Sequence, residues 1–340
     1  MWAAGQALQY FRAAVVALLM LPFLVAVFLL HIPCVLELIR WRDPGSSMTA
    51  VVTLWYRALL SRKGDRDDPG AEALFFQGRI SGISKFGWAW WLIARVFMLF
   101  QQLSGIPVPG VHFPKLPRGK VKDMVAMRVQ FFDEAIAWLF TAKRNISQAV
   151  SLGAGFDTYA YGRMQQLSPG SEVAFFEVDR PATQAAKRGA LKAAGINSSR
   201  VQFVPCDLQR SDWLEDLQRC GFDLSSPAYV HWEGVSMYLS KDAIASTLQT
   251  FAQLAPGSML AFDYLDLSKF PAGYIKKMES LGEPWTFGIE GGESVDTSRI
   301  AVSRLLAKHG LKLARHVCFE DSGGPGVGRF WGGCALAEIM

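Results

Sequence analysis

Apolar residues recur with two different periods along the chain after residue 120. Apolar positions at helical spacing fall in residues 123–140, and further helices are predicted at residues 181–195, 210–221 and 241–257. Between these helices lie short apolar runs of strand length. The predicted strands are residues 148–155, 171–179, 200–208, 228–234 and 258–266. Regular alternation of strands with helices predicts an α/β domain, with a parallel sheet covered by helices on both faces.

A longer apolar segment lies near the N-terminus. Residues 13–36 contain no Asp, Glu, Lys or Arg. At about 1.5 Å per residue they form a helix of about 36 Å, enough to cross a hydrocarbon core of about 30 Å, with a kink expected at Pro22. A signal peptide is the alternative, but its apolar region usually has only about 7–15 residues. We therefore expect a transmembrane helix at about residues 13–36, within a membrane anchor formed by residues 1–47.

Basic residues are more frequent after this segment than before it. Those that follow it are Arg40, Arg42, Arg57, Arg62, Lys63 and Arg66. By the positive-inside rule, the following domain is expected to be membrane-anchored and to face the cytosol.

A second apolar stretch, residues 86–100, contains Trp88, Trp90 and Trp91 and is interrupted by Arg95. It is short for a membrane span, which leaves two alternatives. It is either a helix at the membrane interface, with the tryptophans at headgroup depth, or a lid helix packed on the domain. The four prolines of residues 105–122 indicate a linker or loop. We therefore expect a helical cover or lid at residues 48–122 and a ligand-binding domain at residues 123–340.

Composition narrows the classes of function. The chain has 340 residues, 51% of them apolar and 19% charged, with a net charge of +5. Lysines and arginines are dispersed, so nucleic-acid binding is not expected. The five cysteines are widely spaced and include no CxxC pair, so neither a disulfide framework nor a metal site is expected. The oligomeric state cannot be inferred from the sequence.

Acidic residues stand at the ends of four consecutive predicted strands. They are Asp157, Glu177, Asp179, Asp207 and Glu233. Ligands of parallel α/β sheets bind at this edge, so a polar ligand with several hydroxyl or amino groups is expected there. The turn Gly153-Ala-Gly155 lies 24 residues before Asp179, near the spacing expected for a carboxylate on a ribose. The turn alone does not distinguish a nicotinamide ligand from S-adenosylmethionine.

Several of these stretches resemble the leucine carboxyl methyltransferase family of S-adenosylmethionine-dependent methyltransferases, which also includes polyketide carboxyl O-methyltransferases. The similar stretches, within residues 48–339, are "VSLGAGFDTYAYG", "FFEVDRPATQAAKR", "VPCDL", "WEGVSMYLS" and "GEPWTFGI". The resemblance implies a Rossmann-like class I methyltransferase fold with a mostly parallel seven-stranded sheet. It also implies S-adenosylmethionine as cofactor and O-methylation, most simply of a carboxylate. The predicted anchor points to a lipophilic or membrane-associated acceptor, or to a small molecule delivered there.

The resemblance also implies roles for individual residues. Gly153 and Gly155 are expected to let the backbone approach the methionine part of the cofactor. Asp179 is expected to bind the ribose hydroxyls, with Asp207 and Leu208 at the adenine.

Further positions that match the family lie at the other end of the cofactor. Glu233 is expected near its amino-acid end, and Asp157 near the same edge. Arg128 and Tyr238 are expected to position cofactor or acceptor, and the resemblance identifies no catalytic residue.

Each of these roles has a structural alternative. Asp157, Asp179 and Asp207 could only cap the segments that follow them, Arg128 could be a solvated helix residue, and Tyr238 could belong to the core. His231 could be a base, although a packed strand residue is the simpler expectation.

Two other classes of function remain as alternatives. A nicotinamide-dependent oxidoreductase would require a pyrophosphate-binding glycine pattern, which this turn lacks. A catalytically idle binding module would have lost cofactor positions, and the expected ones are present.

Overall fold

The computed structural model of the chain describes residues 10–26, 29, 32, 47–62, 64–78, 80, 87–104, 124–141, 145–162, 164, 173–210, 213–320 and 330–339. The helices are α2 (Met48–Arg62), α3 (Pro69–Gln77), α5 (Gly87–Ser104), α6 (Met124–Thr141), α8 (Pro181–Ala193), α9 (Trp213–Arg219), α10 (Lys241–Phe251), α11 (Ala272–Ser280) and α12 (Val295–Ala307). The strands are β1 (Gln148–Leu152), β2 (Ala174–Asp179), β3 (Val201–Pro205), β4 (Ala228–Trp232), β5 (Met259–Leu265), β6 (Leu311–Glu320) and β7 (Phe330–Ile339).

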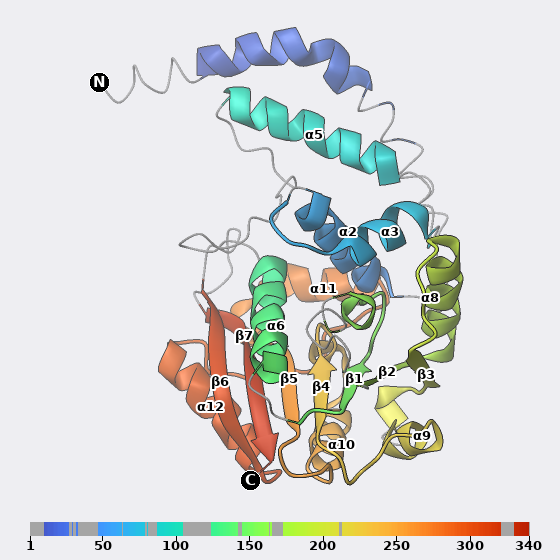
Figure 1. Cartoon of the computed structure of the whole chain (residues 1–340). Helices are drawn as coiled ribbons and strands as arrows, with labels where there is room; N and C mark the ends of the chain where they lie inside the picture. The colour runs from blue at the N-terminus through green and yellow to red at the C-terminus, as the bar shows by residue number, and fades with distance from the viewer. Residues whose placement is uncertain are drawn as a thin grey trace.

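These strands form one sheet of seven strands in the order β3-β2-β1-β4-β5-β7-β6 (Figure 1). β1 to β5 are parallel to their neighbours, whereas β7 runs antiparallel between β5 and β6. The chain order reverses between β1 and β4, which is the place where ligands of such sheets bind. The expected α/β fold with a mostly parallel seven-stranded sheet is confirmed.

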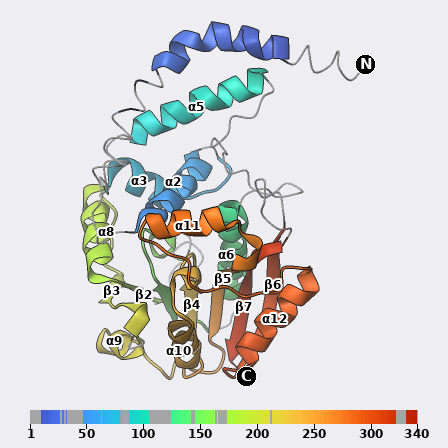
Figure 2. The same ribbon diagram turned by 180° about the vertical axis from the view of Figure 1, so that it is seen from behind.

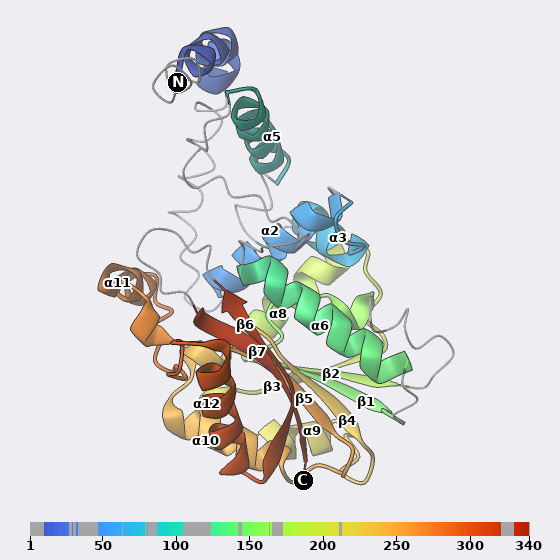
Figure 3. The same ribbon diagram turned by 90° about the vertical axis from the view of Figure 1, so that its left-hand side faces the viewer.

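Helices cover both faces of the sheet, as Figure 3 shows from the side. On one face the apolar side chains of α9, α10 and α12 pack on the sheet, with Trp213, Leu248 and Val302 fully or almost fully buried. On the other face α6 packs through Phe132 and Ile136. Because β1, β4 and β5 are buried along their whole length, their near-continuous apolar sequences are typical of central strands.

A third apolar cluster holds a helical cover against the C-terminal end of the sheet. Val51 and Leu54 of α2 and Leu74 and Phe75 of α3 are buried against Leu191 of α8. α2 and α3 lie between the sheet and α5 (Figures 1 and 2). α2 and α3 fall within the predicted cover of residues 48–122, and the division of the chain into domains stays a prediction.

The helical residues 10–26 and helix α5 lie side by side, away from the sheet (Figures 1 and 3). Arg12 Nε donates a hydrogen bond of 2.7 Å to the carbonyl of Leu103, which ties the two helices together. Ala13 and Met20 are buried, whereas Leu18 and Leu19 are 73% and 71% exposed. On its other side, α5 contacts α3 of the cover.

The predicted transmembrane helix is not supported by the described part of the chain. Among those residues, no helix combines the length and the apolar character needed to cross a membrane. Residues 27–28, 30–31 and 33–36 of the predicted span lie outside the described residues, as do the linker at 105–122 and the side chains of the three tryptophans of α5.

The strands and helices predicted after residue 120 are present with small shifts at their ends. The predicted helix at 210–221 is the short α9, and the predicted strand at 171–179 is β2 without its first residues. β6 and β7 were implied only by the family resemblance. Their apolar pattern is weak because β6 carries the exposed residues Lys312 and Arg315 and β7 contains two glycines.

Candidate functional site

A cavity of about 600 Å³ lies at the C-terminal ends of β1, β2, β3 and β4. The turn after β1 forms its floor, and α2 and the segment 281–285 after α11 form its other walls. All of the site residues predicted from the sequence line it. They are Arg128, Gly153, Gly155, Asp157, Asp179, Asp207, Leu208, Glu233 and Tyr238. The structure thus brings these residues together, while their roles stay predictions.

The turn after β1 requires glycines both for its packing and to keep the cavity accessible to a ligand. Gly153 and Gly155 have φ values of 66° and 43°, which side-chain-bearing residues rarely adopt. A Cβ on Gly153 would lie 2.5 Å from Val235 Cγ2, and one on Gly155 would lie 3.1 Å from the Cβ of Ala50 in α2. Because Gly153 and Gly155 have no side chains, the turn leaves the cavity open and lets helix α2 pack closely against it.

Replacing Gly153 with alanine is expected to destabilise the protein by about 2–4 kcal/mol, because the left-handed backbone and the Val235 clash act together. The measurement is the urea midpoint of unfolding. Gly189→Ala in α8 is the matched control, since a Cβ there meets nothing within 4 Å. This control is expected to be stabilised by about 0.5–1 kcal/mol. Equal effects at the two positions would contradict the packing role of Gly153.

Asp179 at the end of β2 reaches back to the glycine turn. Its Oδ2 accepts a hydrogen bond of 2.6 Å from Gly155 N–H, and its Oδ1 accepts one of 2.7 Å from Arg180 N–H. Burial raises the pKa of this carboxyl group. Arg180 is the N-cap residue of α8, so Asp179 stands one residue before the cap position and bonds the N-cap amide.

Asp207 follows β3 and behaves differently. Its Oδ1 accepts a hydrogen bond of 3.1 Å from Gln209 N–H and so caps the 3₁₀ turn at Leu208–Arg210. The structural alternative for Asp207 is therefore present, and the carboxylate lines the cavity as well. Leu208 is 5% exposed and packs in the core beneath the same wall.

Arg128 and Glu233 form a buried ion pair between α6 and the end of β4. Arg128 Nε donates to Glu233 Oε1 at 3.0 Å, and its Nη1 donates to Asp263 Oδ2 at 3.4 Å. Arg128 is 4% exposed, so the alternative of a solvated helix residue is wrong. Its pairing to two carboxylates instead fixes the wall of the cavity on the side of β4 and β5.

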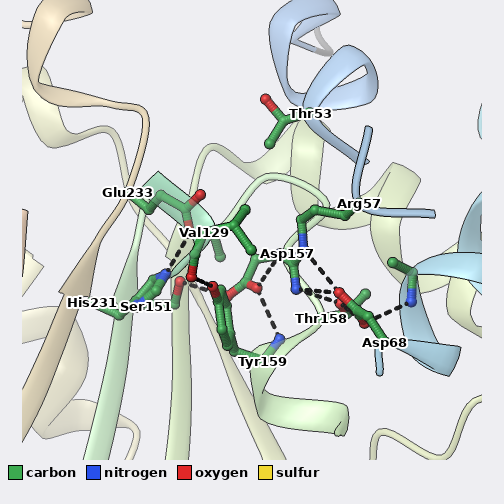
Figure 4. Close-up of polar contacts among 12 residues, drawn as sticks. Thr53, Arg57, Asp68, Val129, Ser151, Asp157, Thr158, Tyr159, His231 and Glu233 are labelled. Atoms are coloured by element: carbon green, nitrogen blue, oxygen red, sulfur yellow. Dashed lines mark hydrogen bonds and ion pairs between the residues drawn. The ribbon is translucent and has the colours of Figure 1, made fainter. Parts of the chain in front are cut away.

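His231 lies two residues before Glu233 on β4 and is packed inside the domain. Its Nε2 is 3.1 Å from Glu233 Oε2, and its Nδ1 is 3.0 Å from the Tyr229 hydroxyl. The rings of Phe132 and Tyr159 flank it at centroid distances of 4.4 and 4.6 Å. His231 is therefore a packed strand residue that holds Glu233 (Figure 4).

Glu233 is expected to make the stability of the protein sensitive to acid. Burial alone would raise its pKa, but the His231 hydrogen bond and the Arg128 charge lower the pKa of Glu233 to about 2. Its contribution to the free energy of unfolding is therefore complete above the ordinary carboxyl value of about 4.3 and is lost as pH falls toward 2. We expect urea midpoints of Glu233→Gln to fall less steeply than those of the wild type between pH 5 and 3.

The control for that measurement is Glu215→Gln on α9, whose carboxylate is 71% exposed in a surface ion pair. Its pH profile is expected to follow the wild type. A Glu233→Gln profile parallel to the wild type would show that Glu233 carries no such linkage.

Arg57 of α2 is a cavity residue that the sequence analysis did not select. Its Nε donates to Asp68 Oδ2 at 3.0 Å, its Nη1 to Asp157 Oδ1 at 2.9 Å, and its Nη2 to Thr158 Oγ1 at 2.8 Å (Figure 4). The guanidinium group also lies 4.4 Å from the centre of the Tyr159 ring. Helical spacing could have revealed it, because Thr49, Thr53 and Arg57 fall four residues apart on one face of α2.

Asp157 is the carboxylate through which the glycine turn holds Arg57. Its Oδ1 also accepts a hydrogen bond of 2.8 Å from Tyr159 N–H, and Ser151 Oγ donates to its Oδ2 at 3.2 Å. Burial would raise its pKa, but the Arg57 charge lowers the pKa of Asp157 well below its usual range. The predicted cap on the next turn is thus present, together with an ion pair to the cover helix.

Glu177, the remaining acidic residue of the strand ends, does not reach the cavity. It forms a buried ion pair of 2.8 Å with Lys187 of α8, and both side chains are 1% exposed. Burial raises the pKa of Glu177 to about 7, although the Lys187 charge opposes this shift. In the described part of the chain, no group of His, Cys, Asp and Glu side chains could hold a metal ion.

Comparison with known proteins bears on the central part of the chain. Residues 109–252 match the family model described as leucine carboxyl methyltransferase. A protein of Bacillus subtilis named "Putative S-adenosyl-L-methionine-dependent methyltransferase YktD" is 32% identical over 177 residues, which cover 51% of this chain and 57% of that protein. A protein of Mycolicibacterium vanbaalenii named "Putative S-adenosyl-L-methionine-dependent methyltransferase" is 37% identical over 144 residues. These residues cover 42% of this chain and 45% of that protein.

The chain spans about half the length of these curated relatives. Among solved structures, that of "a putative methyltransferase" from Thermobifida fusca is 20% identical with a TM-score of 0.46, over 64% of this chain and 81% of that one. The resemblance to the leucine carboxyl methyltransferase family is confirmed for residues 109–252 of the chain.

Proposed function

We propose that the chain is an S-adenosylmethionine-dependent O-methyltransferase. The observation that carries this proposal is the line of carboxylates Asp179, Asp207 and Glu233 along one cavity wall, next to a glycine turn with positive φ angles. The cavity volume of about 600 Å³ is within the range of small-molecule sites. The family match over residues 109–252 and the names of the curated relatives support the same activity.

The residues present fit this cofactor. Asp179 would accept hydrogen bonds from the ribose hydroxyls, because its carboxylate is already fixed by Gly155 at the cavity floor. Asp207 and Leu208 would hold the adenine, and Glu233, kept ionised by its low pKa, would attract the ammonium group. Arg57, which lines the cavity but is paired with Asp68 and Asp157, would hold Asp157 and the glycine turn in place beneath the cofactor.

A carboxylate acceptor fits the site better than a hydroxyl. When bound, the cofactor supplies an electrophilic methyl group on a sulfonium. A hydroxyl acceptor would also need a base, yet His231 is 1% exposed and both its ring nitrogens have partners. A carboxylate carries no proton to remove, so positioning and exclusion of water are what the protein must provide.

Apolar side chains line the part of the cavity formed by α2, α11 and the segment after α11. Among them are Val52 of α2, Met278 of α11, and Leu281, Pro284 and Trp285 of the segment after it. These side chains support a lipophilic acceptor. A nicotinamide-dependent oxidoreductase is not favoured by the comparisons, and a binding module without catalysis is distinguished only by assay.

We also propose that the paired helices at residues 10–26 and α5 attach the protein to a membrane. The support is the exposure of large apolar side chains around residues 10–26, among them Phe11 at 68%, Leu18 at 73% and Phe23 at 63%. Exposure on several sides of one helix suits a lipid environment better than one protein interface. The basic residues that follow in sequence support a cytosolic orientation. Flotation of the full chain with phosphatidylglycerol vesicles tests this attachment, and recovery with the lipid-free fraction would contradict it.

The test of the enzymatic proposal uses the full chain in detergent. Calorimetric titration with S-adenosylhomocysteine is expected to show binding of one equivalent. Transfer of a labelled methyl group from S-adenosylmethionine to long-chain carboxylic acids is expected to give esters. Absence of binding would overturn the cofactor assignment, and binding without transfer to any acid or alcohol would favour a binding module.

A further inference from the structure

The cover helix α2 faces the cavity with a polar stripe made of Thr49, Thr53 and Arg57. These residues lie four apart, so they occupy one face of the helix. Each of them contacts a different part of the domain. The stripe therefore determines how closely α2 lies on the cavity.

The C-terminal half of α2 is held by strong contacts. Arg57 is 3% exposed and pairs with Asp68 and Asp157, each at 2.9 Å. Such a buried and fully paired guanidinium group is costly to separate from its carboxylates. This half of α2 is fixed to the glycine turn and to α3.

The N-terminal half is packed through Val51 in the third apolar cluster, but its polar contacts are weaker. Arg128 Nη2 donates to Thr53 Oγ1 at 3.4 Å, which is a long hydrogen bond. One turn earlier, Thr49 N–H donates to Glu283 Oε2 at 3.1 Å. The first amides of a helix lack partners within it, so this carboxylate caps α2 from a segment 234 residues away.

The segment that carries Glu283 is itself anchored to the sheet domain. Thr286 N–H donates to the carbonyl of Met237 at 2.8 Å, and Thr286 Oγ1 donates to the carbonyl of Leu239 at 2.8 Å. Tyr238 and Trp285 line the same part of the cavity wall, and burial raises the pKa of the Tyr238 hydroxyl. Glu283 is therefore a fixed point against which the start of α2 closes.

We propose that Glu283 is a positioning residue, which holds the N-terminal half of α2 closed over the cavity through the Thr49 amide. The cavity wall formed by Thr49, Ala50, Val52 and Thr53 depends on this half of the helix. Opening it, with Arg57 as the fixed end, gives cofactor and acceptor a way in and out. The entry and exit of cofactor and acceptor through this opening rest on the proposed function, whereas the contact between Glu283 and Thr49 does not.

Hydrogen exchange of the full chain without ligand tests the contact. Glu283→Ala is expected to speed exchange of the amides of residues 49–53 by about tenfold, because a hydrogen bond to a charged group is lost, while residues 57–62 and β1 keep their rates. Glu283→Gln keeps an acceptor oxygen and is expected to restore most of the protection. Glu279→Ala on α11, whose exposed side chain does not line the cavity, is the matched control.

The second measurement is the dissociation rate of S-adenosylhomocysteine. It is expected to rise about tenfold in Glu283→Ala and to return close to the wild-type value in Glu283→Gln. Unchanged exchange at residues 49–53 would overturn the proposal, as would faster exchange spread equally over α2 and β1. Failure of the wild type to bind the ligand would overturn the proposed function, while the exchange result would still decide the role of Glu283.

Discussion

Replacing Asp179 with alanine is expected to weaken binding of S-adenosylhomocysteine by about 10- to 150-fold. This range corresponds to about 1.5–3 kcal/mol for hydrogen bonds to a charged group. Asp179 would lose its bonds to the ribose, and Gly155 N–H would lose the acceptor now at 2.6 Å. The effect on affinity thus includes both a lost contact and a less ordered glycine turn.

The measurement is calorimetric titration of wild type, Asp179→Ala and Asp179→Asn. The asparagine variant keeps an oxygen for Gly155 N–H and is expected to have intermediate affinity. Asp296→Ala on α12, whose carboxylate is 77% exposed, is the control and should bind like the wild type. Wild-type affinity in Asp179→Ala would exclude a role of this carboxylate at the ribose.

Replacing Arg57 with alanine is expected to have the largest effect on stability, about 3–5 kcal/mol. The substitution leaves Asp68 and Asp157 without their main positive partner, and Asp157 has a pKa lowered chiefly by Arg57 against the effect of its burial. In this variant Arg66 still pairs with Asp68, whereas Asp157 stays buried without its ion pair. The urea midpoint should fall, and the glycine turn should become more mobile.

Arg62 in the next turn of α2 provides a matched control. Its ion pair with Glu72 has an N–O distance of 3.4 Å, and its side chain is 38% exposed. Arg62→Ala is expected to cost less than about 1 kcal/mol. If the two arginine variants unfolded at the same urea concentration, the buried network around Arg57 would have no special role in stability.

The candidate site could be predicted from the sequence where its residues stand at strand ends. Asp179, Asp207 and Glu233 each follow a recognisable apolar run, and parallel strands bring their C-terminal ends to one edge. The same reasoning placed Glu177 beside them. It lies two residues earlier on β2, which is enough to bury it against Lys187 instead.

The cover of the site could not be predicted in this way. Arg57 meets Asp157 across 100 residues, and Thr49 meets Glu283 across 234, so no local pattern connects either pair. Both contacts depend on where α2 and the segment after α11 pack, which a strand-and-helix pattern leaves open. The apolar helix at residues 10–26 is the opposite case. Its sequence pattern strongly predicts a membrane span, whereas no helix among the described residues is long and apolar enough to form one.

The position of β7 has a consequence for the order in which the molecule can assemble. β7 follows every other strand in the chain, yet it lies between β5 and β6. During synthesis, β5 therefore has a free edge until residues 330–339 have emerged. Asp263 of β5, which holds Arg128, is covered by its register partner Cys334 only at that stage. The edge of β5 is therefore the last edge within the sheet to be paired, and until then it presents open backbone donors and acceptors to other chains.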